Sequence, residues 1–179
     1  MRETILKAAS SLFYCEGVRA VGMDLIVERS CIAKTTIYRH FRTKDALVAA
    51  FLEREDREFW QQWDDVVAPH VDAPRAALLA LCDWVGARVS RDNYRGCPQI
   101  NVAAEFADSE HPARKVAHRH KAEMVKRLAA LCHGLNASTA DLRAQQIGLL
   151  FDGAFMSHGR LSSVGAHDLL RDAIERLIA

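Results

Sequence analysis

The sequence predicts an all-α protein of about nine helices, with a small N-terminal domain over residues 1–46 and a larger helical domain over residues 47–179. Two observations support this fold class. Apolar residues recur at helical spacing along the chain, and no stretch alternates with a period of two for long enough to form a strand. Prolines and glycines fall between the periodic segments, where helices begin and end.

The first helix is predicted to end at Gly17, because glycine commonly stops a helix. Its apolar stripe consists of Ile5, Ala8, Ala9, Leu12 and Phe13. A second short helix is predicted over Met23–Ser30, with Ile26 facing inward. Residues 30–33 then turn the chain into a third helix.

The third helix, Lys34–Phe41, has two different faces. Ile37 and Phe41 fall on one face, with Ala33 a turn earlier, and can pack on a neighbouring helix. The other face offers hydroxyls, a phenol and cations, from Thr35, Thr36, Tyr38, Arg39 and Arg42. Two short helices joined by a tight turn, the second polar and basic outside, describe a helix-turn-helix. Such a helix fits the major groove of DNA.

The residues of this region follow a recognisable pattern: Ile5-Leu6-Lys7-Ala8-Ala9, Leu12-Phe13, Gly17, Ile26, Ala33-Lys34-Thr35-Thr36-Ile37-Tyr38-Arg39-His40-Phe41 and Lys44-Asp45-Ala46-Leu47. The pattern resembles the DNA-binding domain of the tetracycline-repressor (TetR) family, without gaps, and its portion from Ile37 to Leu47 is highly specific. The resemblance implies a homodimeric transcriptional regulator, most often a repressor. It also implies an operator of double-stranded DNA and release by a small-molecule effector.

Three positions depart from the family pattern. Glycine is usual where Cys31 stands in the turn, and Thr or Ser near Val21 and Gly22 caps the second helix. A serine often caps the third helix where Ala33 stands. Cys31 must therefore tolerate the backbone that glycine would adopt there, including φ > 0, at some strain. Each missing cap costs about 0.5–2 kcal/mol.

We assign two roles to the DNA-facing residues. Phosphates are expected to contact Lys34, Tyr38, His40 and Lys44. Base edges or their flanks are expected to contact Thr35, Thr36 and Arg39. A two-fold symmetric protein requires a palindromic operator, with recognition helices about 34–36 Å apart or a multiple of it.

The distribution of charge agrees with a localised DNA footprint. The net charge is only +1, but residues 1–48 carry eight Lys/Arg against five Asp/Glu, whereas the remainder carries sixteen against eighteen. No apolar run approaches the roughly 18 residues of a membrane span, and no signal-peptide pattern opens the chain. We therefore expect a cytoplasmic protein.

The cysteines do not suggest a disulfide framework or a zinc module, because they are odd in number and contain no CxxC pair. They are Cys15, Cys31, Cys82, Cys97 and Cys132. Most are expected to be small buried hydrophobic residues. Cys97 is the exception, because Arg95-Gly96-Cys97-Pro98 predicts a turn entering a helix, where a thiol can be reactive.

Four helices are predicted after Thr43, which is suited to cap the first of them. They are expected over Lys44–Ala68, Pro74–Ser90, Pro98–Asp108, and from Pro112 until Gly134. The first carries an acid-base run, Glu53 to Glu58, that is typical of a solvated face.

The last two helices have surplus apolar surface. Residues 147–156 are apolar on nearly every side, and a helix of that type is buried on more than one face. The small residues Gly148, Gly153 and Ala154 would let a second helix approach. The final helix, Ala166–Ala179, has two apolar columns, Leu169-Ala173-Leu177 and Leu170-Ile174-Ile178. We expect a homodimer through the Leu142–Met156 and Leu169–Ile178 helices, as the resemblance also implies; a monomer with a tight internal bundle is the alternative.

The larger domain is expected to hold a small-molecule pocket, because the resemblance to the TetR family implies a fold in which this domain usually holds one. Candidate ligand-binding residues are aromatic and polar groups that fall among apolar ones: Trp63, Trp84, Asn101, Phe106, Phe151, Phe155 and His158. For each, plain core packing is the competing interpretation. The sequence does not specify the effector.

Other functional classes have weaker support. The histidines His111, His118, His120 and His133 have no same-face spacing, so no metal site is expected, nor any other cofactor. A helical enzyme with an aromatic-lined active site is the outside alternative, but no phosphate loop or catalytic motif supports it. Redox or electrophile sensing by Cys97 is a variant of the regulator hypothesis.

Overall fold

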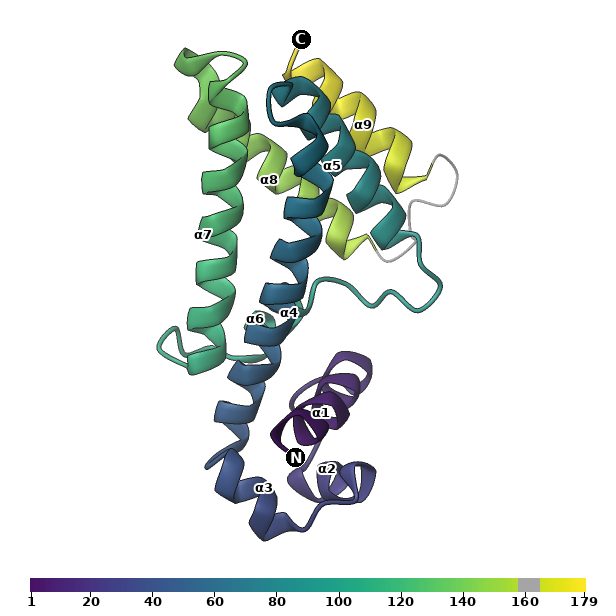
Figure 1. The fold of residues 1–179 in the computed structure, drawn as a ribbon, viewed down its shortest axis with the longest axis vertical. Coiled ribbons are helices and arrows are strands. Elements are labelled where there is room, and N and C mark those ends of the chain that lie inside the picture. The colour runs from purple at the N-terminus through teal and green to yellow at the C-terminus, as the bar shows by residue number, and fades with distance from the viewer. Residues whose placement is uncertain (158–164) are drawn as a thin grey trace. The chain divides into compact units, whose positions relative to one another are not determined.

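The computed structural model describes residues 1–157 and 165–179, and within these residues it is helical, without a strand (Figure 1). The all-α prediction is therefore confirmed. The described helices are α1 (Arg2–Glu16), α2 (Met23–Ser30), α3 (Lys34–His40), α4 (Lys44–Val67), α5 (Pro74–Val89), α6 (Pro98–Glu105), α7 (Pro112–His133), α8 (Ala140–Met156) and α9 (Ala166–Leu177), with short 3-10 turns at Ala68–His70 and Ala137–Thr139.

Prolines, glycines and one threonine fix several helix ends as the sequence predicts. Gly17 ends α1 with φ 87°, a backbone that favours glycine. The Thr43 hydroxyl accepts a hydrogen bond from the Ala46 N–H at 3.0 Å, so Thr43 caps α4. Prolines occupy the first positions of α5, α6 and α7, where a missing N–H costs nothing.

Helix ends without such residues were predicted less well. Helix α6 ends at Glu105 instead of Asp108, and Arg114 donates hydrogen bonds to the carbonyls of Ala103, at 3.3 Å, and Phe106, at 2.9 Å. These bonds satisfy carbonyl groups at a helix end. Helix α3 ends at His40, with Phe41 as its extended C-cap. Helix α8 begins at Ala140, before Leu142.

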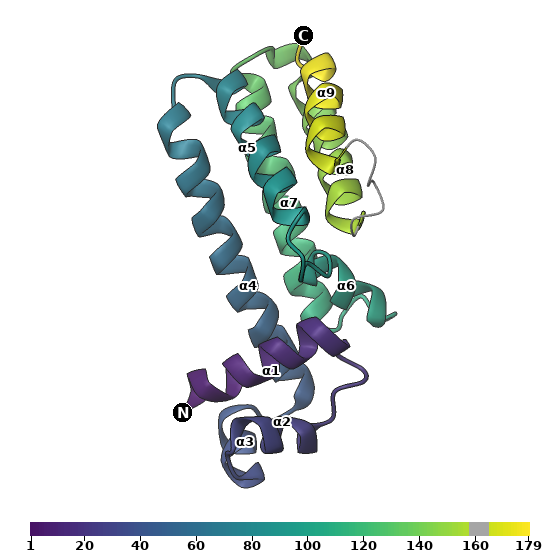
Figure 2. The same cartoon turned by 90° about the vertical axis from the view of Figure 1, so that its right-hand side faces the viewer.

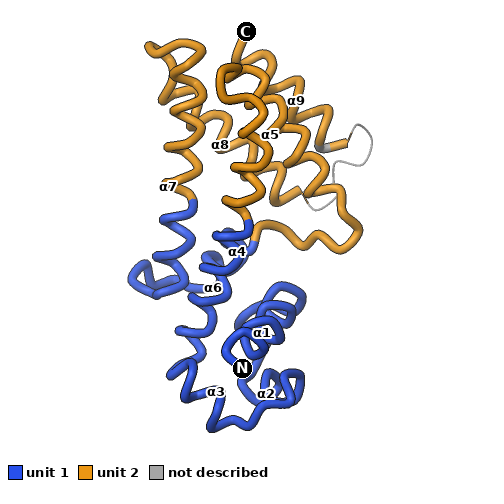
Figure 3. Tube along the Cα trace, viewed as in Figure 1, with its two compact units in different colours: residues 1–58, 98–120 blue, residues 59–97, 121–179 orange. Residues whose placement is uncertain are grey.

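The chain divides into two compact units (Figure 3). Unit 1 comprises residues 1–58 and 98–120, and its core is built from α1 to α4 with Val102, Ala113 and Val116. In this core the rings of Phe13 and Phe51 lie 5.8 Å apart. The functional division at residues 46 and 47 stays a prediction.

Unit 2 comprises residues 59–97 and 121–179. Helix α5 packs against both α8 and α9 (Figures 1 and 2). Gly86 makes the close approach of α9 possible, because a Cβ at this position would lie 2.7 Å from Cβ of His167. No helix in the described residues is long and apolar enough to cross a membrane.

The cysteines, all within the described residues, form no disulfide and lie in two environments. Cys82 and Cys132 are buried, as expected, and Cys97, which the sequence singled out as the exception, is buried too. Burial raises the pKa of the Cys82 thiol to about 12 and also raises that of Cys132. Cys15, near the end of α1, and Cys31, the C-cap of α2, are exposed instead, so for these two residues the expected burial is wrong.

Candidate nucleic-acid interface and effector site

The helix-turn-helix is held together by three mutually packed helices, α1, α2 and α3. Ile26 of α2 and Ile37 of α3 are fully buried, as their helical positions predict. Cys31 in the turn has φ 54° and ψ 30°, the left-handed backbone that glycine would adopt without strain. Its departure from the family pattern therefore carries a local conformational cost.

The two short helices have no side-chain N-caps. Gly22 precedes α2 and Ala33 precedes α3, and neither supplies a capping hydrogen bond. Ser30 instead fastens the turn between them. Its hydroxyl donates to the Val27 carbonyl and accepts from the Ile32 N–H, each at 3.3 Å. This role of Ser30 was not predicted, although Ser commonly bonds nearby backbone groups.

The outward face of α3 carries most of the predicted DNA-binding residues. Ile37 and the cap residue Phe41 are buried on the inner side, at 0% and 3% exposure. The exposed residues are Lys34, Thr35, Tyr38, Arg39 and His40, and Thr36 is half-buried. The structure thus presents hydroxyls, a phenol and cations together on one short helix, which is the chemistry that base edges and phosphates require.

Two predicted phosphate contacts have neighbours that the sequence did not reveal. The ammonium group of Lys34 lies 2.6 Å from the Asp24 carboxylate, and this hydrogen bond raises the pKa of Lys34. Lys44, at the start of α4, is half-buried, and burial lowers its pKa. The negative charges of Glu105 and Asp45 act in the opposite direction.

Glu105 holds the turn between α1 and α2 within unit 1. Its carboxylate accepts hydrogen bonds from the Val18 N–H at 2.9 Å and the Arg19 N–H at 2.7 Å. These donors follow the end of α1 and have no partner in that helix. The sequence did not reveal this contact, because Glu105 follows Arg19 by 86 residues and only the fold brings them together.

Four predicted ligand-binding residues meet in one aromatic cluster of unit 2, around Phe59. Ring centroids are separated by 6.4 Å for Trp63–Trp84, 6.4 Å for Trp63–Phe151 and 6.4 Å for Phe151–Phe155. Phe59 lies 5.0 Å from Trp84 and 6.1 Å from Phe155. The Arg88 guanidinium covers the rings of Phe59 and Trp84. Trp63, Phe151 and Phe155 are almost fully buried, so the cluster also forms the core of this unit.

The other candidate ligand-binding residues are elsewhere. Asn101 and Phe106 belong to unit 1, where Phe106 stacks on His111 with ring centroids 3.8 Å apart. His158 lies outside the described residues. The predicted set is therefore brought together in part.

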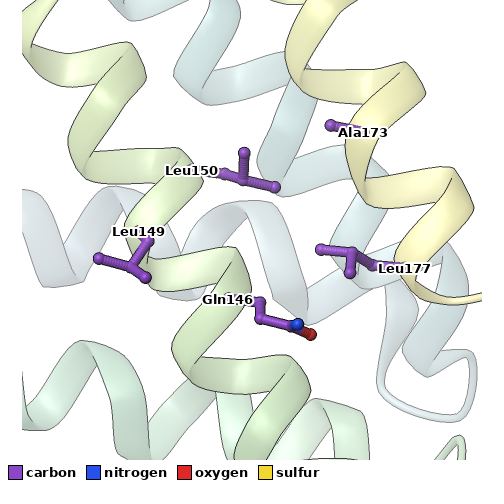
Figure 4. Close-up of a pocket in the computed structure, with 5 residues that line it drawn as sticks. All are labelled: Gln146, Leu149, Leu150, Ala173 and Leu177. Carbon is purple, nitrogen blue, oxygen red and sulfur yellow. The ribbon is translucent and has the colours of Figure 1, made fainter.

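An apolar groove of about 460 Å³ lies between α8 and α9 (Figure 4). Its lining residues are Gln146, Leu149 and Leu150 from α8 and Ala173 and Leu177 from α9. Three exposed leucines belong to the same two helices: Leu142 at 61%, Leu149 at 71% and Leu169 at 44%. The second apolar column of α9, Leu170-Ile174-Ile178, is buried instead. Both helices therefore bury one face and leave a second apolar face open.

Comparison of sequences matches residues 5–51 to the family described as "Bacterial regulatory proteins, tetR family". A transcriptional repressor of the helix-turn-helix type from Mycobacterium tuberculosis is 28% identical over 131 residues, which are 73% of this chain and 66% of the repressor. In other curated relatives, described as uncharacterised regulators, the chain spans only 44% of their length.

Comparison with solved structures extends the similarity to the whole chain. A regulator from Streptomyces avermitilis, described as a TetR-type transcriptional regulator, is 30% identical, with 97% of each chain covered and a TM-score of 0.78. A TetR-family regulator from Streptomyces coelicolor has the same fold, with a TM-score of 0.91 at 24% identity, over 99% of this chain and 93% of that one.

Proposed function

Because this chain belongs to the TetR family of transcriptional regulators, we propose that it acts as a homodimeric repressor that binds a palindromic operator and is released by a small molecule. The outward face of α3 is the observation that carries the proposal. A helix of seven residues buries Ile37 and exposes Thr35, Tyr38 and Arg39, so its polar side is available to a major groove. Residues 1–46 would bind the DNA, and residues 47–179 would bind the effector and the second subunit.

The exposed residues divide into two chemical roles on DNA. Lys34, Tyr38, His40 and Lys44 would hold phosphates, because cations and phenols bind phosphate oxygens without regard to sequence. Thr35, Thr36 and Arg39 would read base edges or their flanks. Thr36 is half-buried, so its hydroxyl has less freedom to rearrange than an exposed one.

The test is a genome-wide selection of DNA fragments with the purified protein, followed by binding of the selected duplex to two variants. Tyr38→Ala should weaken specific and non-specific duplexes alike, because it removes a phosphate contact. Thr36→Ala should change sequence preference, by about 1–3 kcal/mol at the affected base pair. If the selection yields no palindrome, or if both variants bind like the wild type, the proposed function is wrong.

The open faces of α8 and α9 support the homodimer. Leu142, Leu149 and Leu169 are exposed, although burying apolar surface stabilises a protein by about 25 cal/mol per Å². A second copy would present the same leucines and the same groove, which is the self-complementarity that two-fold symmetry requires. A dimer would also supply the pair of recognition helices that a palindrome needs.

The aromatic cluster around Phe59 supports a small-molecule effector. Trp63, Trp84, Phe151 and Phe155 give an apolar, π-rich environment of the kind that lines ligand sites. Cys97-based sensing is the alternative. Cys97 directly precedes Pro98 of α6 but is only 7% exposed, which limits access by an oxidant or electrophile. We therefore favour an effector that binds without covalent chemistry.

A further inference from the structure

We propose that Arg2 is an additional phosphate-binding residue, held in place for DNA by stacking on Phe41. This inference rests on the proposed DNA-binding function and extends the interface from α3 to the first turn of α1. Figures 1 and 2 both place the N-terminal end of α1 beside α3, and these two helices are in contact.

The guanidinium of Arg2 lies over the Phe41 ring, 4.8 Å from its centroid. Phe41 is 3% exposed and closes α3, between the exposed residues His40 and Arg42 and three residues before Lys44. Arg2 therefore stands at the end of α3 where other cations gather. A stacked guanidinium keeps its N–H donors at its edge, in the plane that suits a phosphate. Stacking also reduces the conformational freedom that the side chain would lose on binding.

The charge of Arg2 is not neutralised by an ion pair within the described residues. No carboxylate there forms an ion pair with it, and the adjacent Glu3 lies 2.9 Å from Arg54 instead. Arg54 thus neutralises the carboxylate nearest to Arg2 in the chain. The cation of Arg2 is exposed and open to an external anion.

The position of Arg2 is locally unfavourable, which indicates a role outside its own helix. Arg2 is the first residue of α1, where the helix dipole favours acidic groups such as Glu3 and disfavours cations. The contact with Phe41 offsets part of this cost within the protein. Contact with a DNA phosphate would offset more of it.

Salt dependence of DNA binding tests the proposal. The probes are a fluorescent duplex of about 30 base pairs with random sequence, long enough for two half-sites, and the duplex selected from genomic fragments. Arg2→Gln keeps a flexible polar side chain at this position and removes the charge. It should weaken both duplexes by the same factor. The slope of log affinity against log salt should become shallower by about 0.9 for each phosphate that is no longer neutralised, or about 1.8 for a dimer.

Two further variants make the result specific. Arg2→Lys keeps the charge without the planar stack, so it should keep the slope and bind somewhat more weakly. Lys7→Gln removes an exposed cation from the same helix, five residues away and therefore about 140° around it, and should leave the slope unchanged. If Arg2→Gln has the wild-type slope, or if Lys7→Gln changes it equally, the assignment of Arg2 is wrong. A wild-type protein that binds neither duplex would instead reject the proposed function itself.

Discussion

At the scale of single residues, the pair formed by Lys34 and Asp24 limits how strongly the recognition helix can attract DNA. The two groups are 2.6 Å apart, and Asp24 competes with a phosphate for the same ammonium group. Asp24→Asn should therefore free Lys34, tighten binding to any duplex, and steepen the salt dependence by up to about 0.9 for each protomer. Fluorescence anisotropy over a range of salt concentrations measures both effects.

Glu28→Gln is the matched control, because it removes an exposed acidic charge from the same helix without touching this pair. Equal effects of the two substitutions would mean that only the overall charge of α2 matters. The sequence could not reveal this pair. Asp24 and Lys34 lie on different helices, and only the fold brings them together.

His167 should make stability depend on pH. Its ring lies 2.8 Å from Asp168 of its own helix and 2.9 Å from Asp83 of α5, and these hydrogen bonds raise its pKa above 6.5. Arg171 also binds Asp83, and Glu175 lies beside Arg171. A raised folded-state pKa stabilises the fold fully below the unfolded value near 6.5, and this contribution is lost as pH rises through the folded value.

The measurement is thermal melting of the wild type and His167→Gln from below pH 6 to above pH 8. Glutamine keeps the Cβ that packs against Gly86. The stability difference between the two proteins should be largest at low pH and shrink as pH rises. A difference that is constant over this range would contradict the role of the imidazolium. The effect should be modest, since the side chain is 42% exposed and solvent screens its charge.

At the scale of elements, the sequence predicted helices better than it predicted their faces. Proline and glycine punctuation fixed the starts of α5, α6 and α7, because these residues restrict the backbone locally. The apolar run in α8 has no polar side, so the sequence could not show which of its faces is buried in the subunit. The structure distinguishes the two faces of this run: Phe151 is fully buried, whereas Leu149 is 71% exposed and Leu150 lines the groove. A Cβ added at Gly148 would point toward α7, at ordinary contact distances from Val125 and Leu128, so this position faces the protein's own core and not a second helix.

The proposed dimer predicts the effect of a charge on the outer face of α8. Leu149→Glu would place an unpaired carboxylate in a buried interface, which is costly. Sedimentation should show a folded monomer, and operator binding should fall sharply although α3 is unchanged. Phe151→Glu would instead unfold the protein, because that side chain lies in the core of its own subunit.

Val71→Glu provides the control for this experiment. Val71 is 75% exposed and lies after the 3-10 turn, outside α8 and α9, so a charge there should leave the oligomeric state and DNA binding unchanged. A Leu149→Glu protein that sediments as a stable dimer would rule out this face as the interface.

At the scale of the whole molecule, α4 is the element that would connect the proposed effector to the proposed operator. It is one uninterrupted helix of 24 residues, close to the predicted range of Lys44–Ala68. Lys44 begins it, and Trp63 follows 19 residues later, roughly 28 Å along the axis at 1.5 Å per residue. A ligand that displaces side chains around the buried Trp63 can therefore move the helix that carries Lys44. The sequence indicated this connection but not the chemistry of the ligand, because the aromatic residues involved also serve as core.

Coupling between ligand and DNA is the prediction that follows. A compound that raises the melting temperature of the protein should be found by screening, and then titrated with and without the selected operator. If the compound prefers the state that does not bind DNA, operator should weaken compound binding by about 5- to 150-fold. The compound should weaken operator binding by the same factor, since coupling is reciprocal.

Trp63→Leu, which keeps an apolar core but removes the indole, should reduce compound affinity while leaving operator affinity intact. Equal compound affinity in the presence and absence of operator would exclude coupling through α4. Two explanations would then remain, namely regulation by modification of the Cys97 thiol and constitutive DNA binding. Cys97→Ser would distinguish them, because it abolishes regulation by thiol modification but leaves constitutive DNA binding unchanged.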